Sequence, residues 1–130
     1  MGKVHQITGF LFLAVFLATG LYMGFTFPEA WGEDAGTRMI FRSAHVYILF
    51  SALLNLALAI SSRSRRWNRP RKMASFLLLV APVLFTAAFF IESAAGSMER
   101  PYTLAGAVAC LIGVLVHQLP FRDMKTRGVP

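Results

Sequence analysis

Six side chains that titrate or hydrogen-bond strongly stand in otherwise apolar stretches of this sequence: His5, Arg42, His45, Asn55, Glu92 and His117. Such groups are costly to place among apolar neighbours, so each one calls for a partner or a role. Histidine ligates haem iron and exchanges protons near neutral pH, and a carboxylate can pair with arginine or bind a proton. The chemistry of this chain, if it has any, is expected at these positions.

His5 and His117 form the first candidate site. His5 begins the first apolar stretch and His117 nearly ends the last one. Two histidines from facing helices are the ligand set of a bis-histidine haem b, and Gly9 and Gly113 would leave room for a porphyrin. The alternative is that both are boundary histidines whose rings reach toward the lipid headgroups. The sequence leaves both interpretations open.

Arg42, His45, Asn55 and Glu92 form the second candidate site. Counting from the loop between the second and third stretches at 1.5 Å per residue puts Arg42 and Glu92 at similar heights, about 27 and 28 Å. We therefore expect a buried Arg42–Glu92 ion pair. His45 shares the helix face of Arg42 by its i+3 spacing, and Asn55 lies roughly on that face. The alternative is a polar cavity for a proton or a small polar ligand, as in a proton-coupled transporter using Glu92 and His45.

The elements that would position these residues follow from the composition. Hydrophobic residues make up 56% and charged residues 15% of the 130 residues, against about 45–50% and 25% in soluble domains. The mean hydropathy is +0.58. A soluble domain of this size could not bury so much apolar surface, because small domains bury only about two-thirds of theirs. A soluble enzyme and a disordered tail are both excluded.

Four apolar runs are long enough for a bilayer core of about 30 Å. They cover about residues 6–27, 39–60, 73–95 and 102–119. None alternates with period two, so each is expected to be a helix, which satisfies its own backbone in lipid. Because the loops are short, consecutive helices should be antiparallel neighbours. The sequence predicts an all-α membrane protein, one domain over 1–130, folded as an up-down-up-down bundle of four transmembrane helices.

Small residues and one proline suggest how these helices pack. Gly20 and Gly24 have GxxxG spacing, and the last run carries small residues at 106, 109, 110 and 113. Such spacings let helices approach closely in lipid, and we expect contacts within the chain rather than between copies. Pro82 interrupts the third run, where Thr86 is expected to re-satisfy part of the backbone.

The basic residues indicate an orientation. The second loop and both termini carry ten Lys and Arg against one acid, while the opposite side carries three against five acids. Short cytoplasmic loops are enriched in Lys and Arg, so the pattern predicts N-in/C-in topology with both termini cytoplasmic, in a membrane of the bacterial inner or plasma type. Anionic lipid at the inner face is the expected partner of this charge, rather than nucleic acid.

No sequence pattern of a known catalytic or metal site is present. The chain has no H-E-x-x-H, P-loop or G-x-G-x-x-G pattern, and one cysteine forms no internal disulfide. Short loops leave the spans as the main surface for a partner. The leading interpretation is a non-enzymatic accessory, scaffold or subunit-like membrane protein, with a membrane-protein partner or a second copy. The haem b protein and the small proton-coupled transporter remain the alternatives.

Overall fold

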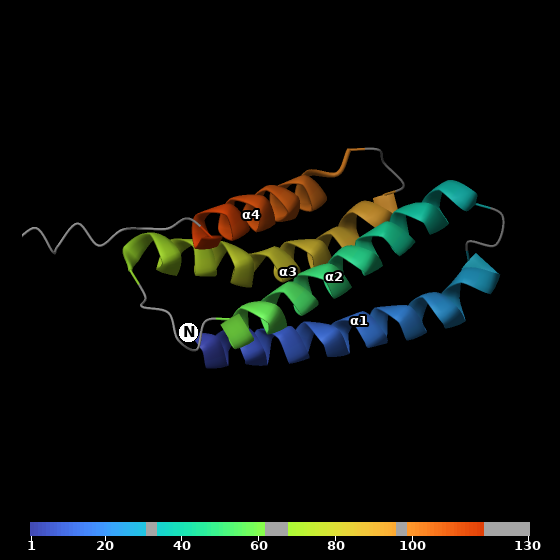
Figure 1. The fold of residues 1–130 in the computed structure, drawn as a ribbon. Helices are drawn as coiled ribbons and strands as arrows, with labels where there is room; N and C mark the ends of the chain where they lie inside the picture. The colour runs from blue at the N-terminus through green and yellow to red at the C-terminus, as the bar shows by residue number, and fades with distance from the viewer. Residues whose placement is uncertain (31–33, 62–67, 96–98, 119–130) are drawn as a thin grey trace, which may run out of the picture.

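The computed structural model describes residues 1–30, 34–61, 68–95 and 99–118. These residues form four helices: α1 (Gly2–Ala30), α2 (Ala35–Ser61), α3 (Arg69–Ala95) and α4 (Pro101–Gln118) (Figure 1). Each is long and apolar enough to cross a membrane. The prediction of an all-α protein with four such helices is confirmed. The first three helices begin about four residues before the predicted apolar runs, because polar residues that cap a helix belong to it without being hydrophobic.

The helix starts are set by capping side chains. Asp34 precedes α2 and accepts hydrogen bonds from the Thr37 backbone N–H at 3.0 Å and from the Thr37 hydroxyl at 2.6 Å. Asn68 precedes α3 and accepts one from the Arg71 N–H at 3.2 Å. These residues satisfy amide groups that the first turn of a helix leaves without partners. α4 begins at Pro101, a favoured first residue because proline lacks the N–H that would be unpaired there.

The helices lie side by side in chain order, with α2 and α3 in the centre (Figure 1). Neighbours are antiparallel: the start of α1 at Gly2 lies near Ala59 of α2, and Gly113 of α4 lies near Ala74 of α3. The haem hypothesis needs the first and last helices to face each other, but α1 and α4 flank the central pair on opposite sides. Four membrane-spanning helices need not close into a ring, because lipid can cover an apolar helix face as well as another helix can.

The core lies along α2 and α3 and is extended by α4. Phe41 and Phe89 meet edge to face, with ring centroids 5.1 Å apart. A Cβ placed at Gly106 would come within 2.7 Å of the Phe85 ring, and one at Gly113 within 2.6 Å of Leu78. The small residues of α4 are therefore contacts within the chain, as predicted.

In α1 the distribution of polar and apolar side chains is the reverse of that in a helix of a soluble protein. Its buried side chains among the described residues are those of His5 and Thr19, whereas large apolar side chains such as Ile7 and Phe10 are 68% and 58% exposed. In water this arrangement would be unfavourable, but in lipid the apolar side chains belong outside and the polar ones between helices. The outward surface of α1 is therefore largely apolar, as is typical of a helix long enough to cross a membrane.

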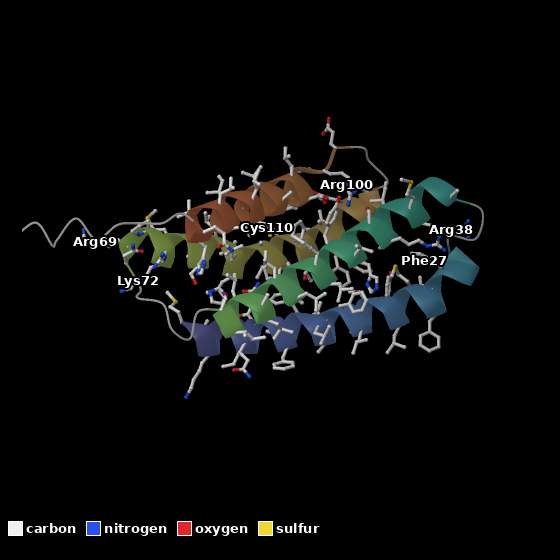
Figure 2. All side chains as sticks on the ribbon, viewed as in Figure 1. Phe27, Arg38, Arg69, Lys72, Arg100 and Cys110 are labelled. Atoms are coloured by element: carbon white, nitrogen blue, oxygen red, sulfur yellow. The ribbon has the colours of Figure 1, made fainter. Side chains whose placement is uncertain are left out.

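The two ends of the bundle differ in charge (Figure 2). At what we call the basic end, where α1 and α3 begin, the charged side chains of the described part are Lys3, Arg69, Arg71 and Lys72. At the opposite, mixed end, they include Arg38, Arg42 and Arg100 together with Asp34, Glu92 and Glu99. The sign asymmetry in the sequence is therefore also a spatial one within the described residues.

Candidate functional site

A group of uncharged polar side chains joins α1, α2 and α3 near the basic end. His5, Asn55 and Ser75 come from these three helices in turn, and each is fully buried. His5 Nδ1 lies 2.6 Å from Asn55 Oδ1, and the opposite ring nitrogen, Nε2, is hydrogen-bonded to the Ser75 hydroxyl. We call these three residues the neutral network.

The neutral network also supplies a hydrogen bond that the backbone of α3 lacks. Pro82 has no N–H, so the Leu78 carbonyl one turn earlier loses its helical donor. The Asn55 side-chain amide donates to this carbonyl at 2.9 Å and to the carbonyl of Ser51 at 2.9 Å. Thr86 contributes a separate bond, donating its hydroxyl to the Pro82 carbonyl at 2.8 Å. An unpaired carbonyl in a span costs free energy, and Asn55 removes that cost.

These acceptors determine where the protons of the network lie. Two backbone carbonyls can only accept, so the Asn55 NH₂ must face them and its oxygen must face His5. His5 therefore carries a proton on Nδ1, and in the neutral imidazole Nε2 accepts from the Ser75 hydroxyl. Both ring nitrogens are occupied, which leaves no lone pair for a haem iron in this arrangement.

The second histidine of the haem hypothesis lies elsewhere. His117 is buried on α4, whereas His5 is on α1, and the α2–α3 pair lies between these helices (Figure 1). The structure does not bring the two imidazoles together. A haem held by both would require α1 and α4 to become neighbours.

The order of contacts in the neutral network matches that of a serine hydrolase. There, too, a serine hydroxyl bonds histidine Nε2, and an oxygen acceptor holds the Nδ1 proton. A nucleophile must also meet its substrate, and Ser75, His5 and Asn55 are each 0% exposed. In this conformation the network ties helices together and has no access for a substrate.

A charged group fastens α4 at the mixed end. The Glu92 carboxylate of α3 is 3% exposed and accepts hydrogen bonds from the backbone N–H of Tyr102, from the N–H of Thr103 at 3.1 Å and from its hydroxyl at 2.6 Å. Arg100 Nε lies 3.6 Å from the same carboxylate, and Arg100 Nη1 donates to the Ser43 hydroxyl of α2 at 2.9 Å. We call these residues the charged cluster.

Glu92 acts here as the N-cap of a neighbouring helix. The first turn of α4 presents unpaired N–H groups and the positive end of the helix dipole, both of which favour an anion. Within the part of the chain that is described, Glu92 pairs with Arg100 and not with Arg42, which is exposed. The predicted ion pair was wrong because height along a helix does not specify the face.

His45 faces yet another way. Its Nδ1 lies 2.9 Å from the Thr19 hydroxyl of α1, and its ring stacks on Phe16 with centroids 4.0 Å apart. The four residues predicted as one polar cluster are therefore distributed. Asn55 is in the neutral network, Glu92 is in the charged cluster, His45 is in the α1–α2 contact, and Arg42 is on the surface.

An apolar groove runs between α2 and α4. It has a volume of about 470 Å³. Its sides include Val46 and Phe50 of α2 and Ala107 and Val114 of α4, and Phe85 of α3 also lines it. It can hold an apolar group and offers no charged residue to a substrate. No set of three or more His, Cys, Asp or Glu able to hold a metal ion occurs among the described residues.

Comparison of the chain with protein-family models, with curated proteins and with solved structures finds no match.

Proposed function

We propose that the chain is an integral membrane protein with an up-down-up-down bundle and N-in/C-in topology, in a membrane of the bacterial inner type. The antiparallel contacts of neighbouring helices support the alternation. The basic end supports the orientation, because Lys and Arg accumulate on the cytoplasmic side. A protease-accessible tag at Pro130 should be protected in intact cells; cleavage from outside would contradict this orientation.

We propose further that it works as a non-enzymatic accessory or subunit-like protein. The observation that carries this proposal is the use of its polar groups. The side chains of the neutral network and of Glu92 form hydrogen bonds between helices of one chain. The groove and most of α1, in contrast, present apolar surface. Such surfaces suit another span, because helices in lipid associate through close apolar packing.

The groove supplies a direct test. Ala107 lines it and is exposed, while the neighbouring Val108 on α4 is also exposed but does not line it. We expect Ala107→Phe to fill the groove and release a stoichiometric membrane-protein partner that co-purifies in mild detergent. Val108→Phe adds a similar bulk outside the groove and should retain that partner. Equal retention by both variants, or a chain that stays alone and turns over a metabolite, would contradict the proposal.

The haem and transporter alternatives each require a rearrangement. A haem ligand role needs His5 to leave Asn55 and Ser75, and a proton-binding role needs Glu92 to leave three hydrogen-bond donors and its ion pair with Arg100. A Soret band lost in both His5→Ala and His117→Ala would establish the haem protein. A pH-dependent transport activity lost in Glu92→Gln without loss of stability would establish the transporter.

A further inference from the structure

The start of α3 combines cations with an apolar surface on one helix face. Arg69 and Lys72 are exposed at the basic end (Figure 2). Met73 and Phe76 follow on the same face by their i+4 and i+7 spacing from Arg69, and they are 72% and 64% exposed. A concavity of about 480 Å³ is lined by Lys72, Met73, Phe76 and Leu77. This surface thus combines cations for the charged head of a ligand with an apolar concavity for its tail.

The electrostatics of this helix start favour an anion. Asp34 caps α2 and Glu92 caps α4, so both helices have a carboxylate at their positive ends. The first turn of α3 contains no acid but has Arg69 and Arg71, with Lys72 directly after them. Cations at a helix N-terminus are unfavourable, because they meet the positive end of the dipole. Asn68 caps the Arg71 N–H with an uncharged oxygen, and the acids of the described residues lie at the mixed end, away from Arg69 and Lys72.

We propose that this surface binds one anionic glycerophospholipid. The phosphate lies against Arg69 and Lys72, and an acyl chain follows Met73 and Phe76 toward the middle of the bilayer. Phe76 is four residues, or about 6 Å along the axis, beyond Lys72, which suits a chain that begins below a headgroup. This inference rests on the proposed membrane orientation and names the lipid at its inner face.

Charge complementarity selects this occupant over a second copy of the chain. A two-fold contact through the same surface would bring Arg69 and Lys72 of both copies together, since the interface of a symmetric dimer repeats the same patch. Four cations would then meet in a medium of low dielectric. A free phosphate would satisfy the cations but would leave the concavity at Met73 and Phe76 unused. A phospholipid satisfies both.

The test measures lipid binding to the purified full chain. The protein is delipidated in a neutral detergent, and phosphatidylglycerol or phosphatidylcholine is added while native mass spectrometry records the bound lipid. We expect phosphatidylglycerol to bind more tightly, and Lys72→Gln to weaken it roughly fivefold, the equivalent of about 1 kcal/mol per cation near an anionic surface. Lys3→Gln is the matched control, because Lys3 is an exposed cation at the same end on α1.

A second pair of variants tests the tail. Phe76→Ala should weaken phosphatidylglycerol binding, whereas Phe10→Ala should not, although Phe10 is 58% exposed on α1. Inorganic phosphate at millimolar concentration should not displace the lipid. Equal losses for Lys3→Gln and Lys72→Gln, equal binding of the two lipids, or displacement by phosphate would each overturn the proposal.

This outcome is separate from that of the proposed function. Recovery of a protein partner depends on the α2–α4 groove and is measured with Ala107→Phe, whereas lipid binding is measured on the isolated chain. Orientation is read from the tag at Pro130. A failure of one assay therefore does not decide the others.

Discussion

The neutral network and the charged cluster solve the same problem at opposite ends of the bundle. Both join three helix segments through buried polar groups and both supply a backbone with partners that it lacks. The neutral network gives an acceptor-only carbonyl a donor from Asn55. The charged cluster gives the donor-only start of α4 an acceptor from Glu92. Whether each group supplies a donor or an acceptor follows from the backbone group that lacks a partner.

The difference also reflects the cost of charge. The neutral network lies within the spans, where an amide, an imidazole and a hydroxyl satisfy one another without any net charge. Glu92 is charged, but it lies where α4 begins and where Arg100 and the helix dipole compensate it. Charged groups are thus paired at the mixed end, and uncharged groups satisfy one another near the basic end.

Removing the carboxylate of Glu92 should have the largest effect on stability. Glu92→Ala leaves two N–H groups and a hydroxyl of α4 unpaired and leaves Arg100 without its counter-charge. We expect a loss of about 2–4 kcal/mol, since breaking a buried ion pair costs 3–5 kcal/mol in soluble proteins and less in membranes. Glu92→Gln keeps an acceptor and should lose less. Unfolding in detergent, followed by circular dichroism, measures both.

A double-mutant cycle identifies the partner of Glu92. Glu92→Gln combined with Arg100→Met should destabilise the protein less than the sum of the single changes, because neither charge is then left buried alone. The same cycle with Arg42→Met should be additive, because Arg42 is exposed and the ion pair of Glu92 is with Arg100. Coupling to Arg42 instead of Arg100 would restore the pair expected from helix heights.

The neutral network should contribute somewhat less. Asn55→Leu leaves the Leu78 carbonyl and the His5 N–H unpaired, for a loss of about 2 kcal/mol. Pro82→Ala restores the helical donor for Leu78, so it should recover part of the stability lost in Asn55→Leu. Thermal unfolding of the two single variants and the double variant measures this recovery. No recovery would show that Asn55 does not act through the carbonyl that Pro82 leaves free.

The sequence predicted the spans but not the contacts between them. Runs of apolar residues are a local property, and their lengths match the bilayer, so four helices could be expected from composition and length. The height of Glu92 was also predictable. Its partner was not, because Arg100 belongs to a loop in sequence and reaches α3 only when α4 folds back. The role of Asn55 depends on a carbonyl 23 residues away, although the placement of His5, Asn55 and Ser75 near the same end of the bundle was a usable signal.

A smaller effect is expected for the α1–α2 contact. His45→Phe keeps a ring to stack on Phe16 but loses the hydrogen bond to Thr19, so the loss should be about 0.5–1 kcal/mol. Thr19→Val should cost a similar amount, and the double variant should cost little more than either single change. A loss as large as that of Glu92→Ala would place His45 among the main contacts of the bundle.

The smallest effect belongs to the exposed carboxylate that caps α2. The Thr37 hydroxyl, followed by the Thr37 N–H, lowers the pKa of Asp34 below its ordinary value of 3.8. A lowered pKa means that the folded state favours the ionised form of Asp34, so the contribution of Asp34 to stability is present above about pH 4 and is lost as the pH falls through the folded pKa.

Asp34→Asn retains a capping oxygen that does not titrate, and it should remove this part of the pH dependence. Unfolding of both proteins between pH 6 and pH 3 measures it, because the other carboxyl groups titrate in each and cancel in the difference. Since Asp34 is open to solvent, the two curves should separate only slightly at low pH. A separation as large as the effect of Glu92→Ala would mean that an exposed cap matters as much as a buried one, which would contradict the contrast between Asp34 and Glu92.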